Sequence, residues 1–292
     1  MVFGEINSAL SIWDRFRKWY RSRKSPTVPP SVATRFVRLL ESHGVHRNQI
    51  PRFIGHGLTL RDVQDDTVLL AKLNEEILEV VCTLFVIRRE WLDGAEKRAH
   101  LCKDFYQRPE AFFSFVKNLI EKNPDERIQG VLIAPNECDW RATALLILQE
   151  TVGYVGEKPI WRYHLCDNLP FTYWKARAYL TACIAICWKR DIFIHGITMP
   201  METIAQLAWG ETLLGWQGEG IWALGHKTWD PEDMALRPEA FLEGINPEQD
   251  NFGIKSGLES WLDLEAQGFM DSGFGKSARQ DFQQELAKHF PS

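Results

Sequence analysis

Two neighbouring stretches in the second half of the chain combine basic and aromatic residues at spacings that suit an anionic ligand. In the stretch 161–164, strand alternation places Arg162 and His164 on one face and two aromatic rings on the other. In the helix expected next, Tyr173 and Arg177 are four residues apart and therefore neighbours. Cationic groups beside aromatic walls suit carboxylates and phosphates. The sequence therefore predicts a candidate ligand site formed by Arg162, His164, Tyr173, Trp174, Lys175 and Arg177.

The same residues support two other interpretations. Arg and Lys side chains could simply stack on aromatic rings at the edge of a packed sheet. Alternatively, the stretch could be the active site of an enzyme that acts on a small anionic substrate. That hypothesis requires one pocket in which four side chains meet, namely His164, Asp167, Lys175 and Arg177.

Metal-binding and covalent chemistry have weaker support in the sequence. Cys183 and Cys187 share a helix face, and His164, Cys166 and His195 could be added to them as metal ligands. The helix is otherwise apolar, however, and free cysteine there behaves as a small hydrophobic residue. A nucleophile elbow, a P-loop and a dinucleotide fingerprint are absent from the sequence. We expect neither a metal site nor a cofactor, and no catalytic residue can be assigned.

Composition places the chain among folded proteins. Of its 292 residues, 45% are hydrophobic and 12% are aromatic, which is enough apolar surface for packed cores. The six cysteines are scattered, and the start of the chain has no secretory pattern, so reduced thiols are expected. Because every apolar run is shorter than the roughly 20 residues of a membrane span, a cytoplasmic protein is predicted.

The charge is distributed unevenly along the chain. Residues 1–30 carry six basic and two acidic side chains, whereas residues 201–292 carry six basic and sixteen acidic ones. Residues 5–24 form an amphipathic pattern with a basic face, and prolines then end the helix predicted over 1–25. Such a helix could contact an anionic membrane surface or nucleic acid, or pack on its own protein.

Residues 31–94 are predicted to form a cluster of short helices. Ser31 can cap the first helix, which ends near Gly44, and a second helix covers 48–54. Thr59 is a plausible N-cap of a third helix, and Asn74 of a longer fourth one with an acidic first turn. A closing helical turn covers 88–94.

This order of helices resembles the five-helix lambda-repressor-like (XRE) helix-turn-helix domain. The resemblance is carried by Leu73 to Leu78 and by Leu84 to Gly94, which is similar to the end of the family's last two helices. It covers about a fifth of the chain and implies a bacterial DNA-associated transcriptional regulator. It also implies that DNA is contacted by Arg47, Arg52, Arg61 and Gln64.

The resemblance weakens at the residues that would touch DNA. Pro51 replaces a small residue of the family pattern, and Gly57-Leu58 lengthens the turn. The expected recognition helix over 59–66 has one Arg and three Asp, and acidic side chains oppose binding to a polyanion. A module that has lost DNA binding and contacts proteins is therefore the alternative to a DNA-binding domain.

The rest of the chain is predicted to be mixed in structure. Residues 95–127 form connecting helices, including an apolar helix that follows Pro109. Residues 128–292 alternate strand and helix patterns: strands near 130–134 and 144–148, a hairpin over 154–165, a helix over 173–190, a strand over 192–197 and a final helix over 278–289. The expected fold class is α+β or α/β, with an all-helical module followed by a mixed α/β domain.

Three functional hypotheses follow from this organisation. The first is a regulatory protein in which the helical module reports on a C-terminal sensor or partner-binding domain of residues 128–292. The second is the enzyme described above. The third is a non-enzymatic assembly protein that binds a protein partner, itself or a membrane surface.

Overall fold

Two of the three polar residues expected to cap helices in the N-terminal half do so. In the computed structural model, which describes residues 30–289 except 125–126, 138–141, 246–252 and 276, Ser31 Oγ accepts the Thr34 amide N–H at 3.2 Å. This bond starts α2 (Val32–Ser42). Asn74 accepts the Ile77 N–H at 2.9 Å and starts α5 (Glu75–Phe85). These two predicted caps are confirmed, whereas Thr59 does not cap a helix. The helix predicted over residues 5–24 lies outside the described residues.

The chain divides into two compact units, and both draw on distant parts of the sequence. Unit 1 comprises Met1–Ala99, Gly153–Ile160 and Leu213–His226, and unit 2 comprises His100–Val152, Trp161–Thr212 and Lys227–Ser292. Along the chain, unit 1 first gives way to unit 2 after residue 99. Residues 100–127 therefore belong to unit 2 rather than forming a separate connection.

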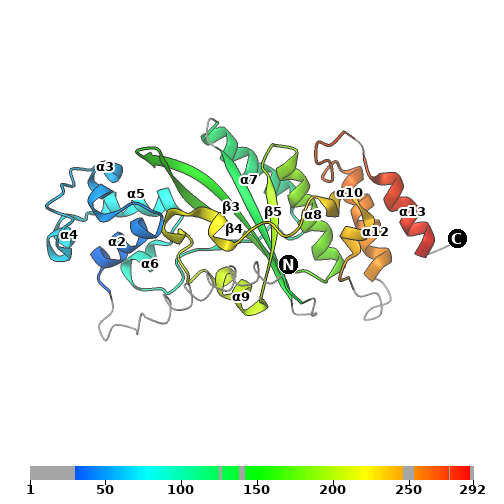
Figure 1. Cartoon of the computed structure of the whole chain (residues 1–292), viewed down its shortest axis with the longest axis horizontal. Helices are drawn as coiled ribbons and strands as arrows, with labels where there is room; N and C mark the ends of the chain where they lie inside the picture. The colour runs from blue at the N-terminus through cyan, green and yellow to red at the C-terminus, as the bar shows by residue number, and fades with distance from the viewer. Residues whose placement is uncertain (1–29, 125–126, 138–141, 246–252, 276, 290–292) are drawn as a thin grey trace, which may run out of the picture. The chain divides into compact units, whose positions relative to one another are not determined.

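Unit 1 is built from short helices around an apolar core (Figure 1). Besides α2 and α5, its elements are η1 (Arg47–Gln49), α3 (Ile50–Ile54), α4 (Asp66–Lys72), α6 (Arg89–Asp93), η2 (Trp216–Gly218) and η3 (Gly220–Leu224). Phe36, Leu40, Ile50 and Phe85 are fully buried. Gly215 lies so close to α2 that an added Cβ would stand 2.0 Å from the Ser42 carbonyl oxygen, so only glycine fits there.

Unit 2 contains a five-stranded mixed sheet in the order β1-β4-β3-β2-β5. The strands are β1 (Cys102–Lys103), β2 (Ile128–Pro135), β3 (Thr143–Val155), β4 (Lys158–Pro170) and β5 (Ile194–Met199). Strand β2 pairs antiparallel with β3 and parallel with β5, and β1 pairs parallel with β4. The tip of the β3–β4 hairpin belongs to unit 1.

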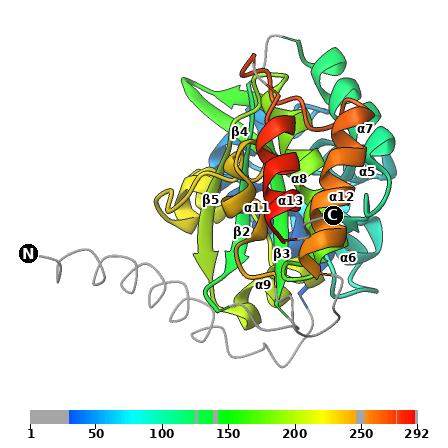
Figure 2. The same cartoon turned by 90° about the vertical axis from the view of Figure 1, so that its right-hand side faces the viewer.

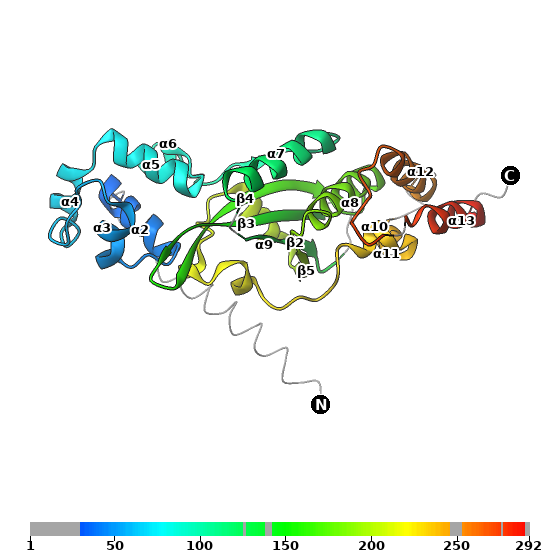
Figure 3. The ribbon, with the colours of Figure 1, turned by 90° about the horizontal axis from the view of Figure 1, so that it is seen from above.

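Helices cover the sheet of unit 2 and extend its core. α7 (Pro109–Lys122) and α8 (Trp174–Trp188) share one apolar cluster with alternate residues of β2, β3 and β4. α12 (Gly253–Ala266) packs against α8, and α13 (Arg279–His289) packs against α12 (Figures 2 and 3). The rings of Trp261 and Phe282 stack between them at 3.7 Å. The remaining helices of unit 2 are α9 (Met201–Trp209), α10 (Asp233–Leu236) and α11 (Pro238–Leu242).

The fold is α+β, with a helical N-terminal region followed by a region of mixed strands and helices, as the sequence predicts. Some elements differ: the short strand β1 lies within the helices predicted over 95–127, β3 and β4 are longer than the predicted strand near 144–148 and hairpin over 154–165, and α12 was not predicted. Residues 60–64 form a turn, and the third helix begins at Asp66 rather than Thr59.

Candidate functional site

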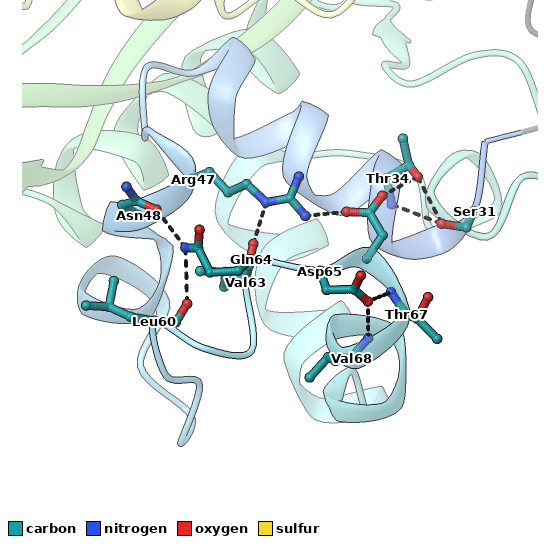
Figure 4. Close-up of polar contacts among 11 residues, drawn as sticks. Ser31, Thr34, Arg47, Asn48, Leu60, Val63, Gln64, Asp65, Thr67 and Val68 are labelled. Atoms are coloured by element: carbon teal, nitrogen blue, oxygen red, sulfur yellow. Dashed lines mark hydrogen bonds and ion pairs between the residues drawn. The ribbon is translucent and has the colours of Figure 1, made fainter.

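The segment that would read DNA in a helix-turn-helix domain is held together by its own polar side chains (Figure 4). Arg47 donates from Nε to the Val63 carbonyl and from its guanidinium to the Asp66 carboxylate. The other oxygen of Asp66 accepts the Thr34 hydroxyl at 2.7 Å. The bond from Thr34, together with Arg47, lowers the pKa of Asp66. Arg47 therefore joins η1 to α4 inside the unit.

Gln64, the candidate base-reading residue, is also engaged within unit 1. Its amide Nε2 donates to Asn48 Oδ1 at 2.9 Å and to the Leu60 carbonyl at 3.2 Å (Figure 4). A side chain with both of these bonds must break them before it can donate to a base edge. Of the four candidate DNA contacts, Arg52 and Arg61 are the two with exposed side chains outside this network.

Two aspartates explain why no helix forms over residues 59–64. Asp62 is buried and accepts both the amide N–H of Thr59 at 2.9 Å and its hydroxyl at 2.7 Å. Asp65 accepts the amide N–H groups of Thr67 at 2.8 Å and Val68 at 3.0 Å. Because short acidic side chains compete for backbone donors, they favour a turn followed by an N-cap. The predicted recognition helix over 59–66 is wrong for this reason.

Exposed apolar side chains are concentrated at the same place. Leu60, Val68 and Leu70 are 59%, 42% and 46% exposed, and only Leu69 of α4 is buried. Successive residues of a helix point about 100° apart, so Val68 and Leu70 stand on opposite flanks of buried Leu69. Our sequence analysis did not identify these residues. The run Val68-Leu69-Leu70 could have revealed them, because a short surface helix cannot bury three consecutive side chains.

Unit 2 separates the predicted ligand residues into two groups. Arg162 and His164 of β4 converge on Glu150 of β3, which is fully buried. Arg162 binds this carboxylate with two bonds of 2.7 and 2.6 Å, and His164 Nε2 lies 2.9 Å from Glu150 Oε2. The Asn123 side-chain amide donates to the same carboxylate.

The electrostatics of this group suit a buried salt bridge. Burial raises the pKa of Glu150, but the bonds from His164 and Arg162 outweigh that effect and hold the pKa at about 2. Burial lowers the pKa of His164 more than Glu150 raises it, which favours the neutral imidazole. Because the carboxylate can only accept, the nitrogen that faces it, Nε2, is the one that must carry the proton. Glu150 was absent from our predicted site. Its signal was a charged residue just after an apolar run, inside β3, because a buried charge requires a partner.

Arg177 is a structural cation inside unit 2. Its side chain is 1% exposed and donates to the carbonyls of Phe171, Phe241 and Glu243 at 2.9, 3.0 and 2.9 Å. Of its predicted neighbours, Tyr173 is exposed and stacks edge-on with Trp174 at 5.5 Å, and Lys175 is half-buried.

Asp167 and the helix cysteines have other partners. Asp167 accepts the Phe105 amide N–H at 2.6 Å, and the Cys183 thiol lies 3.8 Å from its second oxygen. Burial raises the pKa of Asp167 to about 6 and holds the pKa of the Cys183 and Cys187 thiols above its ordinary value. His164, Asp167 and Arg177 thus each bind a different set of groups, so the single pocket required by the enzyme hypothesis is not formed by them.

A shallow hollow of about 260 Å³ lies between α11 and α13 and contains none of the predicted ligand residues. Its walls are mostly charged, including Arg237, Glu285 and Lys288. Arg237 pairs with Asp233, and Lys288 donates to Glu285 at 2.9 Å, so two of its cations are already neutralised.

Comparisons with known protein families, with curated proteins and with solved structures gave no match to this chain. Among the helices that the structure describes, none combines the length and the apolar character needed to cross a membrane.

Proposed function

We propose that this chain is a regulatory protein whose helical unit 1 binds an apolar segment of a protein partner along α4. The observation that carries this proposal is the exposure of Val68 and Leu70 on both flanks of a helix that buries only Leu69. Large apolar side chains that stay in water gain free energy when a partner covers them, by about 25 cal/mol per Å² of apolar surface.

The charge of the unit supports a protein partner over DNA. Residues 30–99 carry ten basic and ten acidic side chains, so they lack the positive excess that drives binding to phosphate. Arg47 and Gln64, two of the four candidate DNA contacts, are committed to Asp66 and Asn48. Of those four candidates, Arg52 and Arg61 are then the two left to meet a phosphate backbone.

A selection with displayed peptides tests the protein-binding function. The full chain is used to select from a library of random peptides, in parallel with Val68→Glu and Leu70→Glu variants and the matched control Ala71→Glu, an exposed position on the same helix. We expect apolar peptides that bind the parent and the control but lose at least about tenfold in affinity for either variant. Peptides that bind all four proteins equally, or no enrichment, would contradict the proposal.

A DNA titration tests the competing function on the same chain. Fluorescence anisotropy with a mixed-sequence duplex at about 50 mM salt favours any phosphate contact that exists. We expect no saturable binding. Saturable binding that weakens in Arg52→Ala and Arg61→Ala would assign unit 1 to DNA.

A further inference from the structure

An exposed aromatic cluster lies on unit 2, and none of its members was among the predicted ligand contacts. Its members, called here the aromatic patch, are Phe113 of α7, Trp188 at the end of α8, Phe193 and Phe274. Phe113, Phe193 and Phe274 are 37%, 45% and 54% exposed. The centre of the Trp188 ring lies 4.8 Å from the centre of the Phe193 ring and 5.6 Å from that of the Phe274 ring. Trp188 therefore brings the end of α8, residue 193 and residue 274 together.

Polar interactions beside the rings tie their neighbouring residues together. The Arg190 guanidinium lies 4.0 Å from the centre of the Phe113 ring and donates to the Ile186 carbonyl at 3.0 Å. Lys189 forms an ion pair with Asp271, which also accepts the Gly273 N–H at 2.9 Å beside Phe274. Fixed aromatic side chains lose little conformational entropy on binding, and Trp and Arg are common at the centres of protein interfaces.

The charges around the patch identify the kind of partner. Lys189 and Arg190 are balanced by Asp191 and Asp271 on the same segments. On α7, Glu110 and Lys117 stand about one turn to either side of Phe113 and add one charge of each sign. A nucleic acid or an acidic peptide needs a positive excess, and the described charges named here are balanced in sign.

We propose that the aromatic patch is the contact through which two copies of this chain associate as a twofold-symmetric dimer. A twofold axis brings the same surface of each copy together, so the surface must complement itself. Aromatic rings can stack on their own symmetry mates. Adjacent residues of opposite charge, Arg190 and Asp191, place the cation of one copy opposite the carboxylate of the other. The proposal concerns unit 2 and does not depend on the function proposed for unit 1.

Sedimentation velocity of the full chain from about 1 to 100 µM tests the dimer, since this range covers the dissociation constants of weak homodimers. We expect a concentration-dependent shift from monomer to dimer. Phe193→Ser and Phe274→Ser should each raise the dissociation constant at least about tenfold. The control is Trp209→Ser, which removes a 61% exposed aromatic residue of unit 2 outside the patch and should leave association unchanged. A monomer at every concentration, or a dimer unaffected by the two Phe variants, would overturn the proposal.

A charge exchange tests the symmetry of the contact. Arg190→Glu and Asp191→Lys chains should each be monomeric alone, because each places like charges together across the axis. Mixing them should restore a dimer of one copy of each, because opposite charges then face each other. Circular dichroism melting curves confirm that each variant is folded. Failure of the folded mixture to associate would refute the twofold arrangement.

Discussion

At the residue scale, the most consequential groups are carboxylates that the fold has removed from water. Glu150 is fully buried and remains charged because Arg162, His164 and Asn123 all bind it. Removing one member of such a group leaves the others desolvated without compensation. The energetic role of each member is therefore best measured by unfolding experiments.

Replacing Arg162 should destabilise unit 2 strongly. Arg162→Ala leaves the Glu150 carboxylate buried without its cation, which costs about 3 kcal/mol in the free energy of unfolding measured with urea. The double variant Glu150→Leu with Arg162→Leu should lose less, because it removes both charges. Lys175→Ala, which removes a half-buried cation without a carboxylate partner of this kind, serves as the control. Equal losses in the single and double variants would contradict the role assigned to Arg162.

The raised pKa of Asp167 predicts a contribution to stability that decreases as pH rises. The lowered pKa of Glu150 predicts the opposite dependence. Burial raises the pKa of Asp167 to about 6, from an ordinary value of 3.8, so the folded state binds a proton that the unfolded state has released. The stabilising contribution of the protonated Asp167 side chain is fully present below the pKa of Asp167 in the unfolded chain. It is lost as pH rises through about 6.

The variant Asp167→Asn should therefore gain stability at both pH 5 and pH 8, with the larger gain at pH 8, where the parent carboxylate is ionised in the folded state as well. Asn can still accept the Phe105 N–H, and it tolerates the left-handed backbone at this position, where φ is 59°. We expect about 1–3 kcal/mol more stability than the parent at pH 8 by urea unfolding. Asp263→Asn, at an exposed position, should show no such gain. A gain that is equal at both pH values would rule out titration of Asp167 as its cause.

At the element scale, capping residues determine where the helices of unit 1 begin. Ser31 and Asn74 matched the sequence prediction, since each accepts the amide N–H three residues later. In segment 59–66 the sequence analysis placed the cap at Thr59, whereas Asp65 is the cap that is used. Asp62 closes the turn on Thr59, and Asp65 starts α4.

Loss of the α4 cap should weaken that helix locally. Asp65→Ala removes the acceptor of the Thr67 and Val68 amide groups and should cost about 1 kcal/mol, whereas Asp65→Ser should retain most of the stability. Hydrogen exchange should show faster exchange of amides in 66–72 with little change in α5. Unchanged exchange in α4 would show that Asp65 is not its cap.

At the scale of the whole molecule, unit 1 is completed by two segments that lie more than 50 residues after its N-terminal part ends at residue 99. Lys158 Nζ donates to the carbonyls of Gly44 and Gln217 at 3.4 Å, and Gly215 packs against Ser42. These contacts bring residues 153–160 and 213–226 onto α2.

A fragment of residues 30–99 should therefore not fold cooperatively. It retains the helix caps but lacks both later segments, so its apolar core is left partly open to water. We expect poor amide dispersion in NMR spectra and a broad thermal transition in circular dichroism, compared with the full chain. A dispersed spectrum and a sharp transition would show that residues 30–99 are an independent domain.

The amino-acid sequence by itself determined most secondary structure and the α+β class of this protein. Hydrophobic periodicity and capping residues act over a few positions, and they predicted α2, α5, α7, α8, the β3–β4 hairpin and β5. For the candidate sites, sequence reasoning found Arg162 and His164 but not Glu150, and found the cluster of helices but not the exposure of Val68 and Leu70.

Only the tertiary structure decided which polar groups are engaged and which surfaces are left uncovered. Arg47, Gln64 and Arg177 have the side chains of ligand-binding residues, yet each is bound by groups 4 to 66 residues away. Whether an Arg binds a ligand or a carbonyl of its own chain depends on which desolvated acceptor the fold brings near. The aromatic patch likewise joins residues from 113 to 274. Such long-range proximity has no period or spacing in the sequence, because it arises when separate elements pack together.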